Sequence, residues 1–175
     1  VNNERLMSLR IPLDHNNNLT IISVYAPTMT YSEEDIDHFY QQPQHIVNQN
    51  PTDKLIILGD FNARVGADNT SWDKALGKFG IGKINSNGEK LLAFCTENNL
   101  IITNTMFKAP DCKKTTWMHP RSKHWHQIDF IVTRQRDKTD VLSTTVMRGA
   151  NCSTDHQMLR AKFSLGLRKV YSKQG

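Results

Sequence analysis

An apolar run near the middle of the chain leads directly into polar residues. Residues 55–58 are all aliphatic, and they are followed within a few positions by Asp60, Phe61 and Asn62. Such a run is typical of a buried strand, along which side chains alternate, so Asp60 and Asn62 are expected on one face and Phe61 in the core. A carboxylate can take a proton from water or bind a metal, and an amide can donate to a phosphoryl oxygen. The run predicts either a phosphate-directed site or an Asx-rich turn that closes an ordinary strand.

The length and composition of the chain are typical of a single domain with a substantial core. It has 175 residues and a net charge of +5, which permits a polyanionic partner without requiring one. Its aliphatic runs are far shorter than the roughly 18 residues of a membrane helix. No secretory signal pattern is visible, and Cys95, Cys112 and Cys152 are odd in number and widely spaced. We therefore expect an intracellular protein with reduced thiols and no membrane segment.

A segment rich in basic and aromatic residues lies in the second half of the chain. Residues 108–126 contain five lysines or arginines against one aspartate, with Trp117 and Trp125 among them. Basic groups contact phosphates, and aromatic rings stack on bases. The segment predicts a nucleic-acid contact, and the alternative is a solvated loop with two partly buried tryptophans.

Strands outnumber helices in the expected secondary structure. A long surface loop is expected at 63–88, and apolar or alternating patterns predict strands at 4–13, 19–26, 55–60, 100–103, 115–118, 126–133, 141–148 and 157–165. Capping signals at Ser32 and Asn85 predict two helices, the first running toward Val47. Pro43 lacks a backbone donor, so we expect a kink or break just before it. These elements predict an α/β sandwich with mainly antiparallel strands.

Two further acids stand at strand ends, in the same layout as Asp60. Asp129 begins the apolar run 128–132, and Asp155 and His156 immediately precede another predicted strand. A carboxylate fixes the tautomer of an imidazole and stabilises its charged form, and Asp129 could supply that carboxylate to His156. Each pattern alone is also typical of a strand cap or a loop. Their joint occurrence with Asp60 favours a catalytic site.

Five short motifs occur along the sequence: Tyr25-Ala26-Pro27, Gly59-Asp60-Phe61-Asn62, Thr116-Trp117, Ile128-Asp129 and Asp155-His156. In their order and context they resemble the endonuclease/exonuclease/phosphatase superfamily, which has the DNase I-like fold. Stretches 62–66, 102–105 and 117–123 further resemble endonucleases of long-interspersed-element (LINE) retrotransposons and craniofacial development protein 2-like proteins. The resemblance runs from about residue 4 to residue 165. It implies a four-layer α/β sandwich of mainly antiparallel sheets, present here as a partial domain at 1–165 without its N-terminal strands. A basic, disordered tail is expected at 166–175.

The resemblance implies a catalytic role for five of the matched residues. Asp60 would position or deprotonate the attacking water, and Asn62 would hold a phosphate oxygen. His156 would stabilise the charge of the pentacovalent phosphorane, and Asp129 would orient His156. Tyr25 would contact the scissile phosphate.

The resemblance also implies a divalent metal and DNA as partners. Asp155 would lie near the metal, for which Mg²⁺ or Mn²⁺ is expected because the ligands are hard oxygens. The family's principal glutamate ligand precedes the region that matches Tyr25, where this sequence has only Glu4, at the wrong end of a predicted strand. The principal ligand is therefore expected to be missing, and apolar surface that the complete fold would cover is expected to be exposed. Contacts with the DNA backbone are expected from Asn62, Thr116, Trp117, Arg121 and Lys123.

The function implied is that of a divalent-metal-dependent endonuclease of retroelement origin that nicks DNA, in the nucleus if DNA is the substrate. The missing glutamate predicts weak or no activity for this chain. One alternative is a non-catalytic, domesticated remnant that binds nucleic acid or protein. Another is an inositol or lipid phosphatase, because the same scaffold supports both chemistries.

Overall fold

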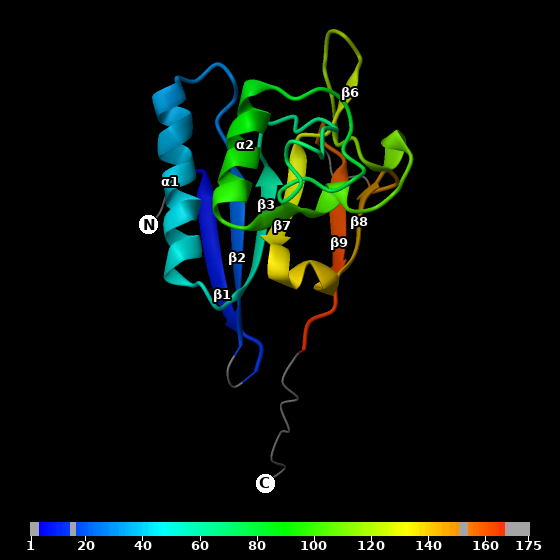
Figure 1. Ribbon diagram of the computed structural model, residues 1–175. Helices are drawn as coiled ribbons and strands as arrows, with labels where there is room; N and C mark the ends of the chain where they lie inside the picture. The colour runs from blue at the N-terminus through cyan, green and yellow to red at the C-terminus, as the bar shows by residue number, and fades with distance from the viewer. Residues whose placement is uncertain (1–3, 15–16, 151–153, 167–175) are drawn as a thin grey trace.

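A five-stranded sheet forms the centre of the computed structural model, which describes residues 4–14, 17–150 and 154–166 (Figure 1). The order of its strands is β1-β2-β3-β7-β4. Only β2 and β3 are parallel, and the other neighbouring pairs are antiparallel. The strands are β1 (Leu6–Pro12), β2 (Asn18–Tyr25), β3 (Lys54–Asp60), β4 (Leu100–Ile102) and β7 (Asp129–Arg134). Apart from Gly166, the expected tail lies outside the described residues.

Two helices, α1 (Glu33–Gln49) and α2 (Ser86–Glu97), lie on the same face of this sheet (Figure 1). Each begins at the predicted cap: Ser32 Oγ accepts from Asp35 N at 3.1 Å, and Asn85 Oδ1 accepts from Gly88 N at 2.8 Å. The main core lies between the helices and the sheet and includes Ile22, Ile57, Phe39, Leu91 and Leu92. No helix in the described part of the chain is long and apolar enough to cross a membrane.

The break expected before Pro43 does not occur. The α1 helix runs without interruption for 17 residues, and Pro43 is buried within it. Ile36, Phe39 and Val47 of the same helix are also buried. A helix in a protein is stabilised mainly by packing of its apolar face, and here that packing offsets the hydrogen bond that proline cannot make.

Two hairpins complete the fold. One consists of β5 (Trp117–Met118) and β6 (Trp125–His126) and projects from the top of the molecule in Figure 1; the other consists of β8 (Val141–Met147) and β9 (Met158–Phe163). Short 3₁₀ helices lie at η1 (Thr103–Thr105), η2 (Asp111–Lys113) and η3 (Gln135–Asp140). The single strand expected at 126–133 is therefore divided between β6 and β7, because the buried Gln127 side chain donates to Lys114 O at 3.1 Å and holds the chain between two sheets. The predicted α/β class with mainly antiparallel strands is confirmed.

Apolar side chains of β1 are exposed, as expected. Met7 is 71% exposed, Leu9 57% and Ile11 37%. Leu6, next to them in sequence but on the other side of the strand, is buried in the core beneath the helices. The sheet therefore has one face covered by helices and another that is apolar and open at its β1 edge.

A buried aspartate joins β1 and β2 to the beginning of β3. Asp53 is 2% exposed and accepts from Arg10 at 2.7 and 3.0 Å and from Thr20 Oγ1 at 2.8 Å. The hydrogen bond from Arg10 holds the pKa of Asp53 below its ordinary value. A carboxylate whose pKa is lowered by folding stabilises the protein above its unfolded-state pKa, and that stabilisation is lost as the pH falls through the folded-state pKa.

Replacement of Asp53 by alanine should lower the free energy of unfolding at pH 7 by about 2 kcal/mol, because Arg10 and Thr20 lose a buried acceptor. The difference in unfolding free energy between the variant and the wild-type protein should narrow as the pH falls below about 4. Urea denaturation measures both effects. Asp37→Ala, which removes an exposed partner of Lys90, is the matched control and should cost less than about 0.5 kcal/mol. Equal losses of unfolding free energy in the Asp53 and Asp37 variants would contradict the stabilising role of the buried Asp53 carboxylate.

Candidate active site

The register of three strands brings distant polar residues into one row. Tyr25 at the end of β2 pairs with Asp60 at the end of β3, and Asp60 pairs with Asp129 at the start of β7. The three residues therefore stand side by side at one end of the sheet, as the sequence motifs require. Gly59 makes this row possible: its φ is +144°, and a Cβ there would lie 1.9 Å from Val24 O on the neighbouring strand.

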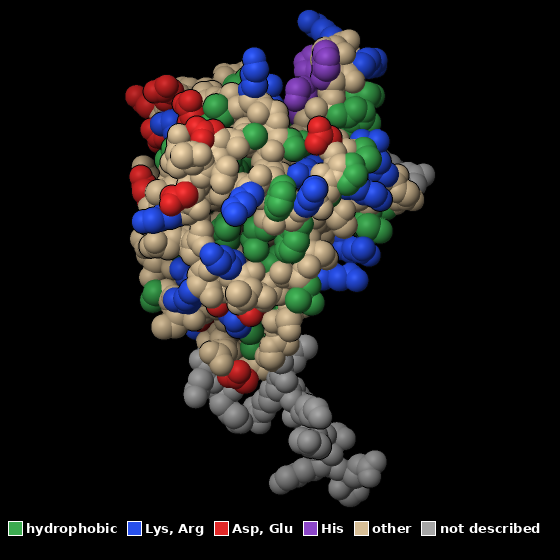
Figure 2. All heavy atoms as spheres, turned by 45° about the vertical axis from the view of Figure 1, so that its right-hand side comes forward, with side chains coloured by type: hydrophobic (Ala, Val, Ile, Leu, Met, Phe, Trp, Pro, Cys, Tyr) green, Lys and Arg blue, Asp and Glu red, His purple; other side chains and the backbone are tan. Residues whose placement is uncertain are grey.

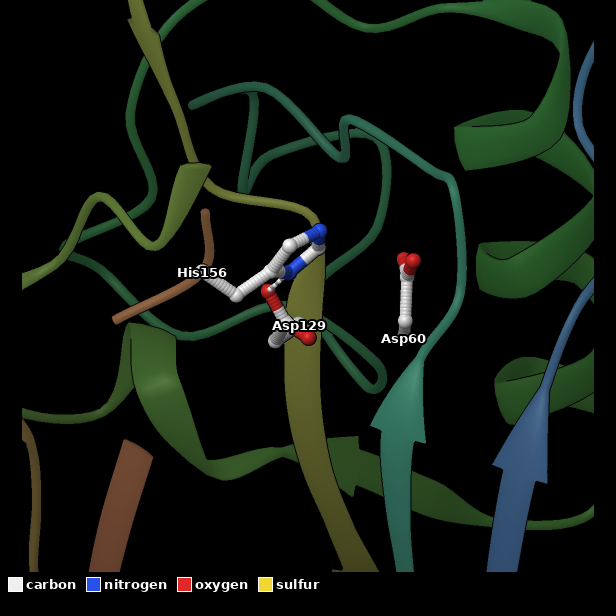
Figure 3. Close-up of side chains that lie close together, drawn as sticks. All are labelled: Asp60, Asp129 and His156. Atoms are coloured by element: carbon white, nitrogen blue, oxygen red, sulfur yellow. Dashed lines mark hydrogen bonds and ion pairs between the residues drawn. The ribbon is translucent and has the colours of Figure 1, made fainter. Parts of the chain in front are cut away.

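His156 completes the cluster from a segment that precedes β9. Its Nδ1 lies 2.9 Å from Asp129 Oδ2, as the dashed line in Figure 3 marks. A backbone bridge between His156 and Trp117 fixes this segment against the β5–β6 hairpin. Asp60 stands on the adjacent strand, and ligand atoms of Asp60, Asp129 and His156 all lie within 4.8 Å of one another. The predicted pairing of Asp129 with His156 is thus present.

Burial and neighbouring charges move the pKa values of these groups in useful directions. Burial raises the pKa of Asp60 to about 6, and the negative charge of Asp129 adds to this effect, while the Asn62 backbone N–H opposes it. The hydrogen bond from Asp129 raises the pKa of His156 above its ordinary value, although burial acts against it. Asp60, with a pKa of about 6, can therefore act as a base near neutral pH, and the bond to Asp129 favours the protonated form of His156.

Asn62 lies just beyond β3 in the left-handed backbone region, with φ of 48°. Its N–H donates to Asp60 Oδ1 at 2.8 Å, and its side-chain Nδ2 donates to Ala26 O at 2.9 Å. Phe61 between them is buried in the core, as predicted. Asn62 thus holds the Asp60 carboxylate and ties the ends of β2 and β3 together, and its side chain lines the same cleft as Asp60.

A cleft of about 620 Å³ opens above this row of residues. One side is formed by the loop after β2 and the other by the β5–β6 hairpin; the lining includes Tyr25, Thr28, Met29, Thr30, Asp60, Asn62, Arg64, Asn85, Trp117, His119, His126, Ile128 and His156. Aromatic, cationic and acidic groups therefore surround one space. Such a space can take a phosphate flanked by organic groups.

Trp117 connects the hairpin to the acid proposed for the metal. Its Nε1–H donates to Asp155 Oδ2 at 2.9 Å, and this bond lowers the pKa of Asp155. Asp155 is exposed and ionised, but it does not belong to the group formed by Asp60, Asp129 and His156.

Thr116 is not placed for the DNA contact expected of it. Its side chain is fully buried, and Oγ1 accepts from Ile128 N at 3.2 Å and from Asp129 N at 3.3 Å. The hydroxyl supports the backbone of Asp129 and cannot reach a ligand in the cleft. Strand propensity and motif position gave no indication of this burial.

Arg121 and Lys123 lie at the exposed tip of the β5–β6 hairpin. Figure 2 shows basic and histidine side chains together on this projection. Lys123 has a positive φ of 58°, and its N–H bonds to His119 O at 3.0 Å, so the tip is a tight turn. The hairpin therefore presents exposed basic groups beside the cleft.

Asn104 is a supporting residue for which sequence reasoning assigned no role. It is 4% exposed, donates from Nδ2 to Asp129 O at 3.1 Å and accepts from Ile131 N at 2.9 Å. Its side chain therefore makes the backbone hydrogen bonds that a neighbouring strand would make at the beginning of β7, and it fixes the backbone of Asp129. An amide two residues after the short apolar run 100–102 was the available signal.

The acidic cluster suits a hard divalent cation only in part. Carboxylate oxygens of Asp60 and Asp129 are donors that Mg²⁺ and Mn²⁺ prefer. One oxygen of Asp129 already bonds His156, so these residues would supply few of the roughly six ligands such an ion takes. Among the described residues no glutamate belongs to this group, and Glu4 is exposed ahead of β1.

Comparison with curated proteins identifies relatives over nearly the whole chain. Craniofacial development protein 2 from Bos taurus is 40% identical over 172 residues, which cover 96% of this chain and 28% of the bovine protein. The protein of the same name from Tragulus javanicus is also 40% identical over 172 residues and is covered to 29%. The chain thus spans less than a third of the length of these relatives.

Solved structures share the fold at low sequence identity. The endonuclease domain of TRAS1, a telomere-specific non-LTR retrotransposon, superposes with a TM-score of 0.63 and 14% identity, covering 92% of this chain and 64% of that domain. A variant of the 3′ phosphatase NExo from Neisseria, bound to product DNA hairpin, has a TM-score of 0.63 and 18% identity, with coverage of 91% and 65%. The chain therefore spans about two thirds of each domain.

The family model described as endonuclease-reverse transcriptase matches residues 19–160, which include every proposed catalytic residue. Members of the surrounding superfamily are hydrolytic nucleases or phosphatases. The sequence motifs, the sheet that aligns them and the solved neighbours agree. The chain belongs to the endonuclease-reverse transcriptase family and has the DNase I-like fold of the endonuclease/exonuclease/phosphatase superfamily.

Proposed function

We propose that this chain carries the acid–base half of a divalent-metal-dependent DNA endonuclease of retroelement origin, acting in the nucleus. The observation that carries the proposal is the cluster of Asp60, Asp129 and His156, of which Asp60 and His156 line a cleft that basic and aromatic side chains also line. Nothing in ordinary strand packing requires two acids side by side, one of them with its pKa raised by burial.

The chemistry proposed is hydrolysis of a phosphodiester by water. Asp60, with its pKa near 6, accepts the proton of the water as the new P–O bond forms and the bond to the leaving oxygen breaks. Protonated His156 donates a hydrogen bond to a phosphoryl oxygen as negative charge develops there. Asp129 keeps His156 charged and oriented, and Tyr25 at the end of the row contacts the phosphate.

A bound Mg²⁺ or Mn²⁺ would supply Lewis-acid neutralisation of the phosphate charge. Asp155, whose Oδ2 accepts from Trp117, is the residue proposed to lie near the metal. Trp117, Arg121 and Lys123 are proposed to contact the DNA backbone from the hairpin. Because no described glutamate joins the acidic group, we propose that this chain alone cleaves slowly.

A second candidate function is DNA binding without cleavage, as a domesticated remnant. It is favoured by the same lack of a glutamate in the described acidic group, combined with a hairpin whose basic and aromatic side chains are present and exposed. Salt-dependent DNA binding without turnover would support this candidate.

Nicking of supercoiled plasmid tests the chemistry. With Mg²⁺ the chain should slowly produce nicked circles, and EDTA should abolish the reaction. Asp60→Ala and His156→Ala should each reduce the rate by roughly 100-fold or more, because each removes a group that handles a proton or charge in the transition state. Lys138→Ala, an exposed change in η3 at the far end of β7, should nick at the wild-type rate. If both site variants nick as well as the Lys138 variant, the assignment is wrong.

Titration of His156 by NMR tests its pairing with Asp129. In the wild-type chain the titration midpoint should lie above about 6.5, and Asp129→Asn should lower it because the partner charge is lost. The stabilisation contributed by protonated His156 is full below its unfolded-state pKa and is lost as the pH rises through the folded-state pKa. Asp37→Asn on α1 is the control. An equal shift of the His156 titration midpoint in this variant would contradict the pairing of His156 with Asp129.

Asp60→Asn should raise the midpoint of thermal unfolding at pH 7 by a few degrees. Burial disfavours the ionised carboxylate, whereas a neutral amide still accepts from the Asn62 N–H. Because the folded-state pKa of Asp60 is raised, the gain should shrink as the pH falls toward about 4, where the carboxyl is protonated when folded. Asp129→Asn should show no such gain, since it breaks the contact with His156. If calorimetry shows a lower unfolding midpoint for Asp60→Asn than for wild type at pH 7, the ionised Asp60 carboxylate does not destabilise the fold.

A further inference from the structure

An arginine lies over two tyrosine rings at the rim of the cleft. The Arg5 guanidinium carbon is 5.4 Å from the ring centroid of Tyr25 and 4.9 Å from that of Tyr31. Arg5 Nη2 donates to Tyr31 Oη at 2.8 Å, and Nη1 donates to Tyr25 O at 3.4 Å. Tyr25 belongs to the catalytic row, but neither the proposed mechanism nor the hairpin uses Arg5 or Tyr31.

The loop that carries Tyr31 is held in place from several sides. Tyr31 N donates to Thr28 O at 3.1 Å, and the hydroxyls of Thr28 and Thr30 lie 2.7 Å apart. The buried Asn87 of α2 donates to Pro27 O at 3.0 Å. Ser32 then caps α1. The aromatic groups therefore stand on a hydrogen-bonded turn, so ordering them for a ligand costs little entropy.

Large side chains at the end of β2 and in this loop are exposed together. Tyr25 is 52% exposed, Met29 54% and Tyr31 45%. Tyr25 and Met29 line the catalytic cleft, and Tyr31 lies beside it in a smaller hollow with Arg5 and Pro27. Exposed aromatic rings with an adjoining arginine are the elements on which the bases of a single nucleic-acid strand stack.

The charges around the loop favour binding of a base at Tyr31 and disfavour a phosphate backbone that continues past Tyr31. Glu33, Glu34 and Asp35 form the first turn of α1, immediately after Ser32. They would repel a phosphate backbone that continued past Tyr31. Arg5 contacts both tyrosine rings, and the cation Arg64 lines the cleft. A strand bound here would keep its phosphates over the cleft and place a base on the loop.

We propose that Arg5, Tyr25, Met29 and Tyr31 form a stacking ledge that binds unpaired bases of a DNA strand whose phosphate enters the cleft. The inference rests on the proposed function and makes its substrate more specific: the strand at the site is locally single-stranded. The ledge lies across the cleft from the β5–β6 hairpin, so the two elements hold different parts of the substrate.

Binding measured by fluorescence anisotropy in EDTA tests the ledge without cleavage. The probes are a short labelled oligothymidine and an oligomer of equal length whose sugars carry no bases. Tyr31→Ala should weaken binding of oligothymidine by about 5- to 10-fold, the effect of losing one stacked base, and leave binding of the baseless oligomer unchanged. Tyr31→Phe keeps the ring and should bind oligothymidine within about twofold of wild type.

Leu142→Ala, which removes a side chain that is 59% exposed on β8, is the control and should bind both oligomers normally. Equal weakening of both oligomers by Tyr31→Ala, or no weakening of either, would overturn the proposal. Circular dichroism of the Phe and Ala variants separates loss of folding from loss of stacking. If the wild-type chain does not nick plasmid but Tyr31→Ala still weakens binding of oligothymidine, the proposed cleavage is refuted and the stacking ledge is supported.

Discussion

The hydrogen-bonded register of β2, β3 and β7 is the constraint on which the candidate site depends. It places Tyr25 beside Asp60 and Asp60 beside Asp129, although more than 100 residues separate the first from the last. A shift of one residue in either pairing would turn these side chains to the opposite face. Gly59 permits the close approach of β2, and Asn104 and Thr116 bond the beginning of β7, so several independent contacts fix the row.

The row has an electrostatic cost that His156 relieves. Burial disfavours the ionised form of Asp60, and the negative charge of Asp129 on the adjacent strand adds to this effect. His156 offsets the charge of Asp129 and lowers the pKa of Asp60, without returning it to the ordinary value. The pKa of Asp60 therefore stays at about 6, close to neutral pH. Strain of this kind persists in a fold only when the surroundings over-determine the geometry.

Local sequence patterns predicted the elements whose structure is decided locally. The apolar run into Asp60 and the cap at Asn85 appear where expected. The pairing of Asp129 with His156, 27 positions apart, was predicted from the motifs taken together and not from a local pattern. The errors arose where tertiary contacts decide. Packing on the sheet carries α1 through Pro43, and burial turns the Thr116 hydroxyl toward the backbone of Asp129. Arg5 and Tyr31 are 26 positions apart, and no periodicity in the sequence connects them.

The distribution of functional groups separates substrate binding from charge neutralisation. Asp60, His156, Trp117 of the hairpin and Met29 of the loop after β2 all line one cleft, and Asp129 bonds His156. The acidic group offers a metal few ligands, and the chain spans about two thirds of the solved nuclease domains. A phosphate in this cleft would be positioned by the sheet edge, yet its charge would be only partly compensated. The groups that would hold a phosphate and those that would compensate its charge therefore lie in different parts of the fold.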